Sequence, residues 1–174
     1  MKEFLKLTKP QYDNLDREKT LFLSVMSPVE VHGTHLPNGT DIFIAREVMT
    51  RFVSGLSSVP KFKNEDSEKI TESFFAFGKF IPEIRELIPI QLPELPVGAQ
   101  PQPVSGSIPV KWRTLRDILI SWGEKLASDG FKYWMIFDNH GGFTHQLAQR
   151  AASIKLQKKH DFFLLIPFLQ IMKD

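Results

Sequence analysis

The chain has no cysteine and no long hydrophobic run, and each absence excludes a class of protein. Without cysteine it forms no disulfide and offers no thiolate to a metal ion. No apolar stretch approaches the roughly 18 residues that a transmembrane helix needs. The first residues carry Glu3, Asp13 and Asp16 and lack the apolar core of a secretory signal. We therefore expect a cytoplasmic protein with no membrane partner.

An excess of charge is also missing. Twenty-two basic and 20 acidic residues among 174 leave a net charge of +2. No stripe of basic residues with interleaved aromatics is present, so we expect no nucleic-acid partner. A length of 174 residues falls within the range of about 100–200 residues that is typical of one domain. The sequence predicts a single domain over residues 1–174.

Strands and helices are expected to alternate along this chain. Continuous apolar runs at 21–26, 133–137 and 162–166 indicate buried strands. A further strand around Ile90 must lie at an edge, be short or be interrupted, because Pro93 cannot donate to a sheet.

Three segments show the apolar spacing of helices and lie between these strands. They begin near Thr40, Lys111 and Phe143, and the second is expected to end at Asp129 and Gly130. For the third, the predicted inner face consists of Phe143, Leu147, Ala151 and Ile154. Alternating strands and helices with unbroken apolar strands predict an α/β fold, a three-layer α/β/α sandwich with a mostly parallel sheet.

The segment 30–41 carries more potential for chemistry than any other. Within EVHGTHLPNGTD it places Glu30, His32, His35 and Asp41, and carboxylates and imidazoles are the side chains that bind divalent transition metals. On an extended backbone Glu30 and His32 share one face. Asp41 is expected in the first turn of the helix that Thr40 would cap, where its charge is favoured. A Gly/Pro-rich loop with hydrogen-bonded polar side chains is the alternative, but the group as a whole favours metal.

A second polar cluster follows the strand at 133–137. Asp138, Asn139, His140, Gly141 and Gly142 come directly after its last apolar residue. Open α/β sheets place their sites at the carboxyl ends of strands. Four of the five histidines lie in or beside the two clusters, so we expect both clusters to meet around one site.

These two clusters resemble the signature of the creatininase (creatinine amidohydrolase) family. The family pattern E-x-H-G-x-H-L-P-x-x-T-D is complete in residues 30–41, and a later N-G-H-G-G is altered here to residues 138–142. The resemblance covers about residue 20 to the C-terminus, with residues 56–89 as an insertion. It implies a creatininase-like fold and a homo-oligomer.

The resemblance also implies a metal-dependent hydrolase that attacks a C–N bond of a small amide, cyclic amide or formamide through a metal-activated water. Glu30, His32, Asp41 and His140 would be metal ligands, with Asp41 bridging two ions. His35 and Asn139 would support the ligands from outside the metal shell. The metal would be zinc or manganese, with one or two ions bound. Catalysis would rest on Glu30, Asp41 and His140 through the metal-bound water.

One departure from the family pattern leaves alternatives open. Creatinine-hydrolysing relatives supply a further carboxylate two residues after the signature histidine, where this chain has Gly142. Relatives with Gly-Gly supply it from a later H-A-G-E segment, which the 174 residues do not contain. A short family member, a fragment of a longer protein and a chain that borrows groups from a neighbour all fit. A non-catalytic metal-binding or interaction protein with a partial site is the alternative function, and a plain α/β domain with hydrogen-bonded histidines is a third.

Overall fold

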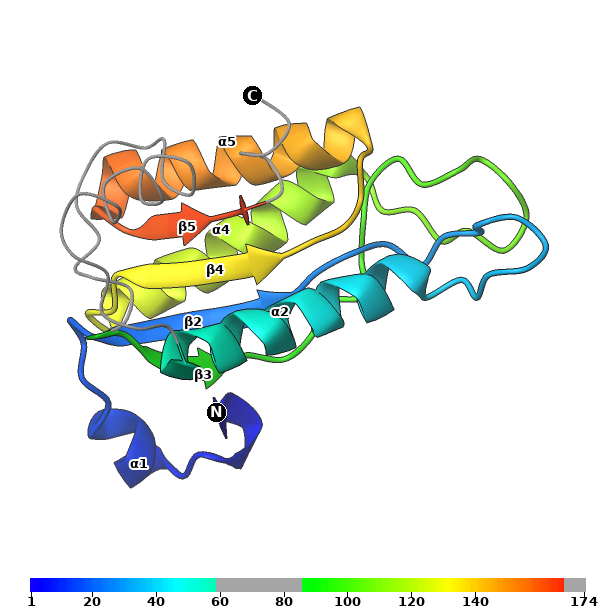
Figure 1. Ribbon diagram of the computed structural model, residues 1–174. Helices are drawn as coiled ribbons and strands as arrows, with labels where there is room; N and C mark the ends of the chain where they lie inside the picture. The colour runs from blue at the N-terminus through cyan, green and yellow to red at the C-terminus, as the bar shows by residue number, and fades with distance from the viewer. Residues whose placement is uncertain (59–85, 168–174) are drawn as a thin grey trace, which may run out of the picture.

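The computed structural model describes residues 1–58 and 86–167 (Figure 1). The expected insertion at 56–89 therefore lies mostly outside the described residues. At its two ends, helix α2 (Thr40–Ser58) includes residues 56–58 and strand β3 (Ile88–Gln91) includes residues 88 and 89. The insertion stays a prediction.

The described strands form one parallel sheet. From one edge to the other the order is β1 (Lys2–Glu3), β3, β2 (Thr20–Val25), β4 (Tyr133–Phe137) and β5 (Phe163–Leu165). The two central strands pair from Leu21 with Tyr133 to Val25 with Phe137, and every residue of both is buried. Burial on both faces explains why these strands have no alternating polar residues.

Strand β3 is short, as Pro93 predicts, and its pairing ends at Gln91. It does not form the edge, because β1 pairs with its outer side through Lys2 and Glu3. The sequence did not indicate β1, whose two residues are both exposed and polar. A strand this short gives no hydrophobic pattern to detect.

Helices cover both faces of the sheet (Figure 1). Helix α2 lies on one face, whereas α4 (Trp112–Ser128) and α5 (Phe143–His160) lie on the other. The 3-10 helix η1 (Phe4–Lys6) and helix α1 (Lys9–Asp13) precede β2. None of the described helices is long and apolar enough to cross a membrane.

The core is divided by the sheet into two clusters, which confirms the three-layer α/β/α sandwich. On the α2 side, Leu21, Leu23 and Val25 pack with apolar residues of that helix. On the α4 and α5 side, the alternate strand residues pack with both helices. That second cluster includes Phe22, Trp134, Ile136, Leu115, Leu119, Ala148, Ala152 and Leu156.

The predicted inner face of α5 is wrong. Phe143 is 71% exposed, and Leu147 and Ile154 are also exposed. The buried face instead consists of His145, Ala148, Gln149, Ala152 and Leu156. Apolar spacing mispredicted this face because α5 buries small residues against α4 and two polar side chains against the carboxyl end of the sheet. There His145 Nδ1 accepts a hydrogen bond from Ala99 and Gln149 Nε2 donates one to Asp138.

Candidate metal centre

The segment between β2 and α2 presents the first group of ligands. Its backbone is held by bonds from the Glu30 N–H to the Asn38 carbonyl and from the Thr40 N–H to the Pro37 carbonyl. Gly33 has a φ of 76°, a conformation that glycine adopts without a steric penalty. Thr40 is the first residue of α2, and its hydroxyl donates to the Pro37 carbonyl instead of capping the helix from outside. Asp41 lies in the first turn, as predicted.

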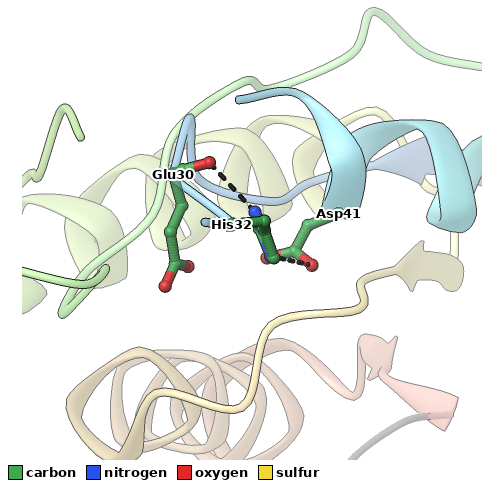
Figure 2. A group of neighbouring side chains, drawn as sticks. All are labelled: Glu30, His32 and Asp41. Atoms are coloured by element: carbon green, nitrogen blue, oxygen red, sulfur yellow. Dashed lines mark hydrogen bonds and ion pairs between the residues drawn. The ribbon is translucent and has the colours of Figure 1, made fainter. Parts of the chain in front are cut away.

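His32 points its Nε2 atom at Asp41 (Figure 2). The Nε2 atom lies 3.2 Å from Asp41 Oδ1, and the other ring nitrogen, Nδ1, lies 3.0 Å from the Glu30 carbonyl oxygen. A carbonyl only accepts, so Nδ1 carries the hydrogen and donates it. In the neutral ring the lone pair of Nε2 therefore faces the carboxylate, whereas in the charged ring Nε2 carries a second hydrogen there. The neutral ring has the tautomer of a metal-binding histidine whose second nitrogen is held by a backbone carbonyl.

His140 approaches the carboxylate of Asp41 from the loop after β4. As in His32, one ring nitrogen faces backbone carbonyls and the other faces the site. Its Nε2 atom lies 3.2 Å from the Ala99 carbonyl oxygen and 3.2 Å from that of Gln100. Its Nδ1 atom lies 2.9 Å from Glu30 Oε2 and 3.5 Å from Asp41 Oδ2. In the neutral ring the hydrogen is on Nε2 and the Nδ1 lone pair faces two carboxylates, whereas in the charged ring Nδ1 also carries a hydrogen and donates it to them.

Glu30 contributes a buried oxygen whose position fits a cation. Its Oε1 atom accepts from the backbone N–H of Gln102 at 2.9 Å. Its Oε2 atom is buried and has no hydrogen-bond partner among the described residues, although His140 Nδ1 is near. A buried anionic oxygen without a partner is costly, and a cation that several lone pairs share removes that cost.

The electrostatics of the site keep its carboxylate ionised. Burial by itself would raise the pKa of Asp41, but hydrogen bonds from His140 and Asn139 and the charge of His32 lower that pKa overall. For His140, burial favours the neutral ring, whereas Asp41, Glu30 and Asp138 favour the charged ring and raise its pKa overall. The carboxylates thus favour positive charge at this position, and a bound cation would supply it.

The four side chains predicted as ligands therefore converge. Atoms of Glu30, His32 and Asp41 that can bind metal all lie within 4.8 Å of one another. His140 joins them through its contacts with Glu30 and Asp41, well inside the limit of about 10 Å beyond which shared metal bonds of about 2.0–2.1 Å would be impossible.

A family sequence model described as creatinine amidohydrolase matches residues 5–173. The chain belongs to the creatininase family. The match begins well before residue 20, the expected start of the resemblance, and so includes α1. A comparison with curated protein sequences gives no match.

Solved creatininase structures share the fold of this family member. A creatinine amidohydrolase (creatininase) structure superposes with a TM-score of 0.63 at 16% identity, and a structure described as creatininase Mn does so with 0.63 at 14% identity. Both alignments cover 94% of this chain and 56% of the other chain. A creatininase variant complexed with creatine has a TM-score of 0.63 at 12% identity, with 99% and 60% covered. The chain thus spans little more than half the length of these creatininases.

Asn139 and His35, the two residues expected to support the metal ligands, lie in different surroundings. Asn139 Nδ2 donates to Asp41 Oδ1 at 3.3 Å, so it can orient that carboxylate. His35 is exposed and forms no hydrogen bond with a proposed ligand in the part of the chain that the structure describes. Its supporting role stays a prediction.

Gly142, where the family resemblance led us to look for a carboxylate ligand, has no room for a side chain here. A Cβ atom at this position would lie 2.4 Å from His140 Nε2, 2.9 Å from the Gln100 carbonyl oxygen and 3.1 Å from that of Ala99. The backbone φ of −59° is open to any residue, so glycine is needed for space alone.

Sequence reasoning missed the groups that surround the ligands. The carbonyls of Ala99 and Gln100 and the N–H of Gln102 come from the long loop before α4, and backbone groups leave no trace in side-chain patterns. His145 and Gln149 were also missed as a pair. The two residues are four apart on a helix that begins just after His140, and this spacing could have indicated that their side chains meet.

Proposed function

We propose that this chain is a metal-dependent amidohydrolase that acts on a C–N bond of a small amide, cyclic amide or formamide. The observation that carries the proposal is the convergence of Glu30, His32, Asp41 and His140 with their lone pairs directed at one region. Membership of a family described as creatinine amidohydrolase and the complex of a structural relative with creatine support a small amide-type substrate.

The contacts support two metal positions that share Asp41. Its Oδ1 atom faces His32 and its Oδ2 atom faces His140, so each oxygen can serve a different ion. Glu30 Oε2 lies 2.9 Å from His140 Nδ1, which assigns Glu30 to the His140 side. That side would have three protein ligands, as catalytic zinc sites commonly have, whereas the His32 side would have two.

Zinc or manganese fits this set of oxygen and nitrogen donors. Structural relatives described as creatininase Mn and as a Zn-Zn type creatininase support the same two metals. When bound, such an ion supplies Lewis acidity and lowers the pKa of bound water to about 7.

The chain's own residues would prepare the site for this chemistry. Glu30 and Asp41 supply two negative charges from positions that are 6% and 4% exposed, so water screens their attraction for a cation only weakly. His32 and His140 hold their hydrogens on the nitrogens that face backbone carbonyls, which frees the opposite nitrogens as ligands. Asn139 fixes the orientation of Asp41 by its hydrogen bond.

We also propose that the chain is a cytoplasmic homo-oligomer. Exposed Phe143, Leu147 and Ile154 on α5 support a partner surface on this helix, because large apolar side chains gathered on one helix face favour association. The alternative function, a non-catalytic metal-binding or interaction protein, is supported by the two-ligand set on the His32 side.

Zinc titration of the metal-free chain by calorimetry tests the proposal. We expect one tight step and one weak step, because ligand number governs affinity. Asp41→Asn, which removes the shared charge without changing the size of the side chain, should weaken both steps. Asp117→Asn, on the exposed surface of α4, should change neither. A wild-type chain that binds zinc no better than Asp41→Asn contradicts the proposed site.

Turnover then separates the enzyme from the alternative. The zinc- or manganese-loaded chain should hydrolyse at least one member of a panel of creatinine, formamides and short linear amides. Creatinine would open to a single linear product, whereas the formamides and linear amides would release an amine or ammonia. Asp41→Asn should hydrolyse none of them. Metal binding without turnover on the whole panel would favour the non-catalytic function.

A further inference from the structure

A second group of buried polar side chains lies behind His140 and contributes no proposed ligand. The side chains of Asp138, His145 and Gln149 are fully buried. The rings of His140 and His145 meet edge to face with their centroids 5.0 Å apart. Most buried polar groups in proteins form hydrogen bonds, and the bonds that this group forms show what it holds in place.

The hydrogen positions in this group follow from one backbone contact. The N–H of Ala99 donates to His145 Nδ1 at 3.1 Å, so Nδ1 carries a lone pair and Nε2 carries the hydrogen. That Nε2 lies 3.0 Å from Asp138 Oδ2, to which it donates. Gln149 Nε2 donates to the same oxygen at 2.7 Å. Both nitrogens of His145 are thus committed to hydrogen bonds, and this group does not offer a second metal site.

The peptide groups around Ala99 connect His145 to His140. His145 holds the Ala99 N–H, while the carbonyl of Ala99 and that of Gln100 face His140 Nε2 at 3.2 Å each. Gln100 has a φ of 58°, in the left-handed region that costs energy for a residue with a Cβ. Its side chain is anchored too, because Gln100 Oε1 accepts from the Thr144 N–H at 2.7 Å.

Asp138 holds the backbone of His140. Its Oδ1 atom accepts from the backbone N–H of His140 at 3.1 Å and from the hydroxyl of Ser27 at 2.6 Å. The network therefore contacts His140 through its backbone and, by way of the Ala99 carbonyl, through its ring. A ring held with its hydrogen on Nε2 can present only Nδ1 to Glu30 and Asp41.

We propose that His145 is a positioning residue for the metal site. By accepting the Ala99 N–H it holds the Ala99–Gln100 carbonyls against His140 Nε2, and so fixes the ring orientation in which Nδ1 is a ligand. This inference rests on the proposed function, since it needs His140 to bind metal. Partners that orient a metal-binding histidine typically change metal affinity by about 10- to 100-fold when removed.

Two substitutions of His145 separate positioning from packing. In His145→Asn the side-chain oxygen takes about the place of Nδ1 and can accept the Ala99 N–H, whereas the bond to Asp138 is lost. In His145→Gln the side-chain nitrogen takes about the place of Nε2 and can donate to Asp138, whereas the Ala99 contact is lost. Each variant loses one buried hydrogen bond, so a residue that serves only the stability of the core would give the same result in both.

The measurement is the zinc dissociation constant of the full chain by chelator competition, with thermal unfolding of each metal-free variant recorded beside it. We expect His145→Gln to weaken zinc binding by about 10- to 100-fold and His145→Asn to stay within about threefold of the wild type. His145→Gln with unchanged affinity, or equal losses in both variants, would overturn the proposal. If His145→Gln does not fold, a tenfold or larger loss in His145→Asn alone overturns it.

A wild-type chain that binds no zinc would overturn the metal site and this role together. A wild-type chain that binds zinc, with both variants unchanged, would leave the proposed function in place and remove only the role of His145. The two failures are therefore distinguishable in one set of titrations.

Discussion

Replacing Gly142 by alanine should damage the candidate metal centre, and the structure sets the size of the effect. The added Cβ atom would lie 2.4 Å from His140 Nε2, which is 1.0 Å short of the 3.4 Å at which ordinary contact begins. The ring cannot simply remain in place, and the Ala99 and Gln100 carbonyls also lie within 3.1 Å of the new atom. We expect the ring to shift by about 1 Å, whereas metal bonds hold their lengths to within about 0.2 Å.

Two measurable losses should follow from that shift. Overpacking of a buried site typically costs about 1–3 kcal/mol in free energy of unfolding, measured by chemical denaturation of the metal-free chain. Zinc affinity should fall by at least the 10- to 100-fold that is typical of disturbed ligand orientation, measured by chelator competition.

The neighbouring glycine provides a matched control. A Cβ atom at Gly141 would meet nothing within 4 Å, so Gly141→Ala should leave zinc affinity within about threefold of the wild type. The reasoning is refuted if Gly142→Ala binds zinc as tightly as Gly141→Ala. Gly142→Glu, which restores the carboxylate of some relatives, should also fail to strengthen zinc binding, because its Cβ atom meets the same obstruction.

Three further predictions concern neighbouring and distant parts of the chain. Asn139→Ala should weaken zinc binding by about 10- to 100-fold, because its hydrogen bond to Asp41 is lost. His35→Ala should give the smaller loss, because His35 is exposed. A zinc titration with the opposite order would make His35 the main supporting residue. Gly123→Ala should destabilise the chain by about 1–3 kcal/mol, because its Cβ atom would lie 2.4 Å from Leu156 Cδ1. Gly55→Ala, whose Cβ atom meets open space, should stabilise α2 by up to about 1 kcal/mol. Equal changes in the free energy of unfolding, measured by denaturation, would contradict the close packing of α4 on α5. Two hydrogen bonds from Arg46 lower the pKa of Glu94. The pair therefore stabilises the fold at pH values above the ordinary pKa of a glutamate, and this contribution is lost as pH falls through the lowered value. Glu94→Gln should cost about 0.2–1 kcal/mol in free energy of unfolding at neutral pH and nothing in acid, and a cost that persists in acid would show that charge is not its cause.

The sequence by itself was sufficient for the layers of this fold and for the members of its candidate site. Buried parallel strands require unbroken apolar runs, so residues 21–26 and 133–137 identified β2 and β4 to within one residue at each end. The ligand types in residues 30–41 and His140 were also visible, because coordination chemistry restricts which side chains can bind a metal. Parallel strands bring their carboxyl ends to one edge, which is why two clusters about 100 residues apart were expected to meet.

Tertiary structure decided which face of α5 is buried and how His140 is oriented. Apolar spacing assigns Phe143 and Leu147 to the core, but the position of α5 over the loop before α4 buries His145 and Gln149. The cost of burying them is lowered by hydrogen bonds from Ala99 to His145 and from Gln149 to Asp138, and Ala99 comes from a different part of the chain. The ring of His140 is likewise held by two backbone carbonyls, and carbonyls are common to every residue, so only the folded path of the chain determines which ones reach it.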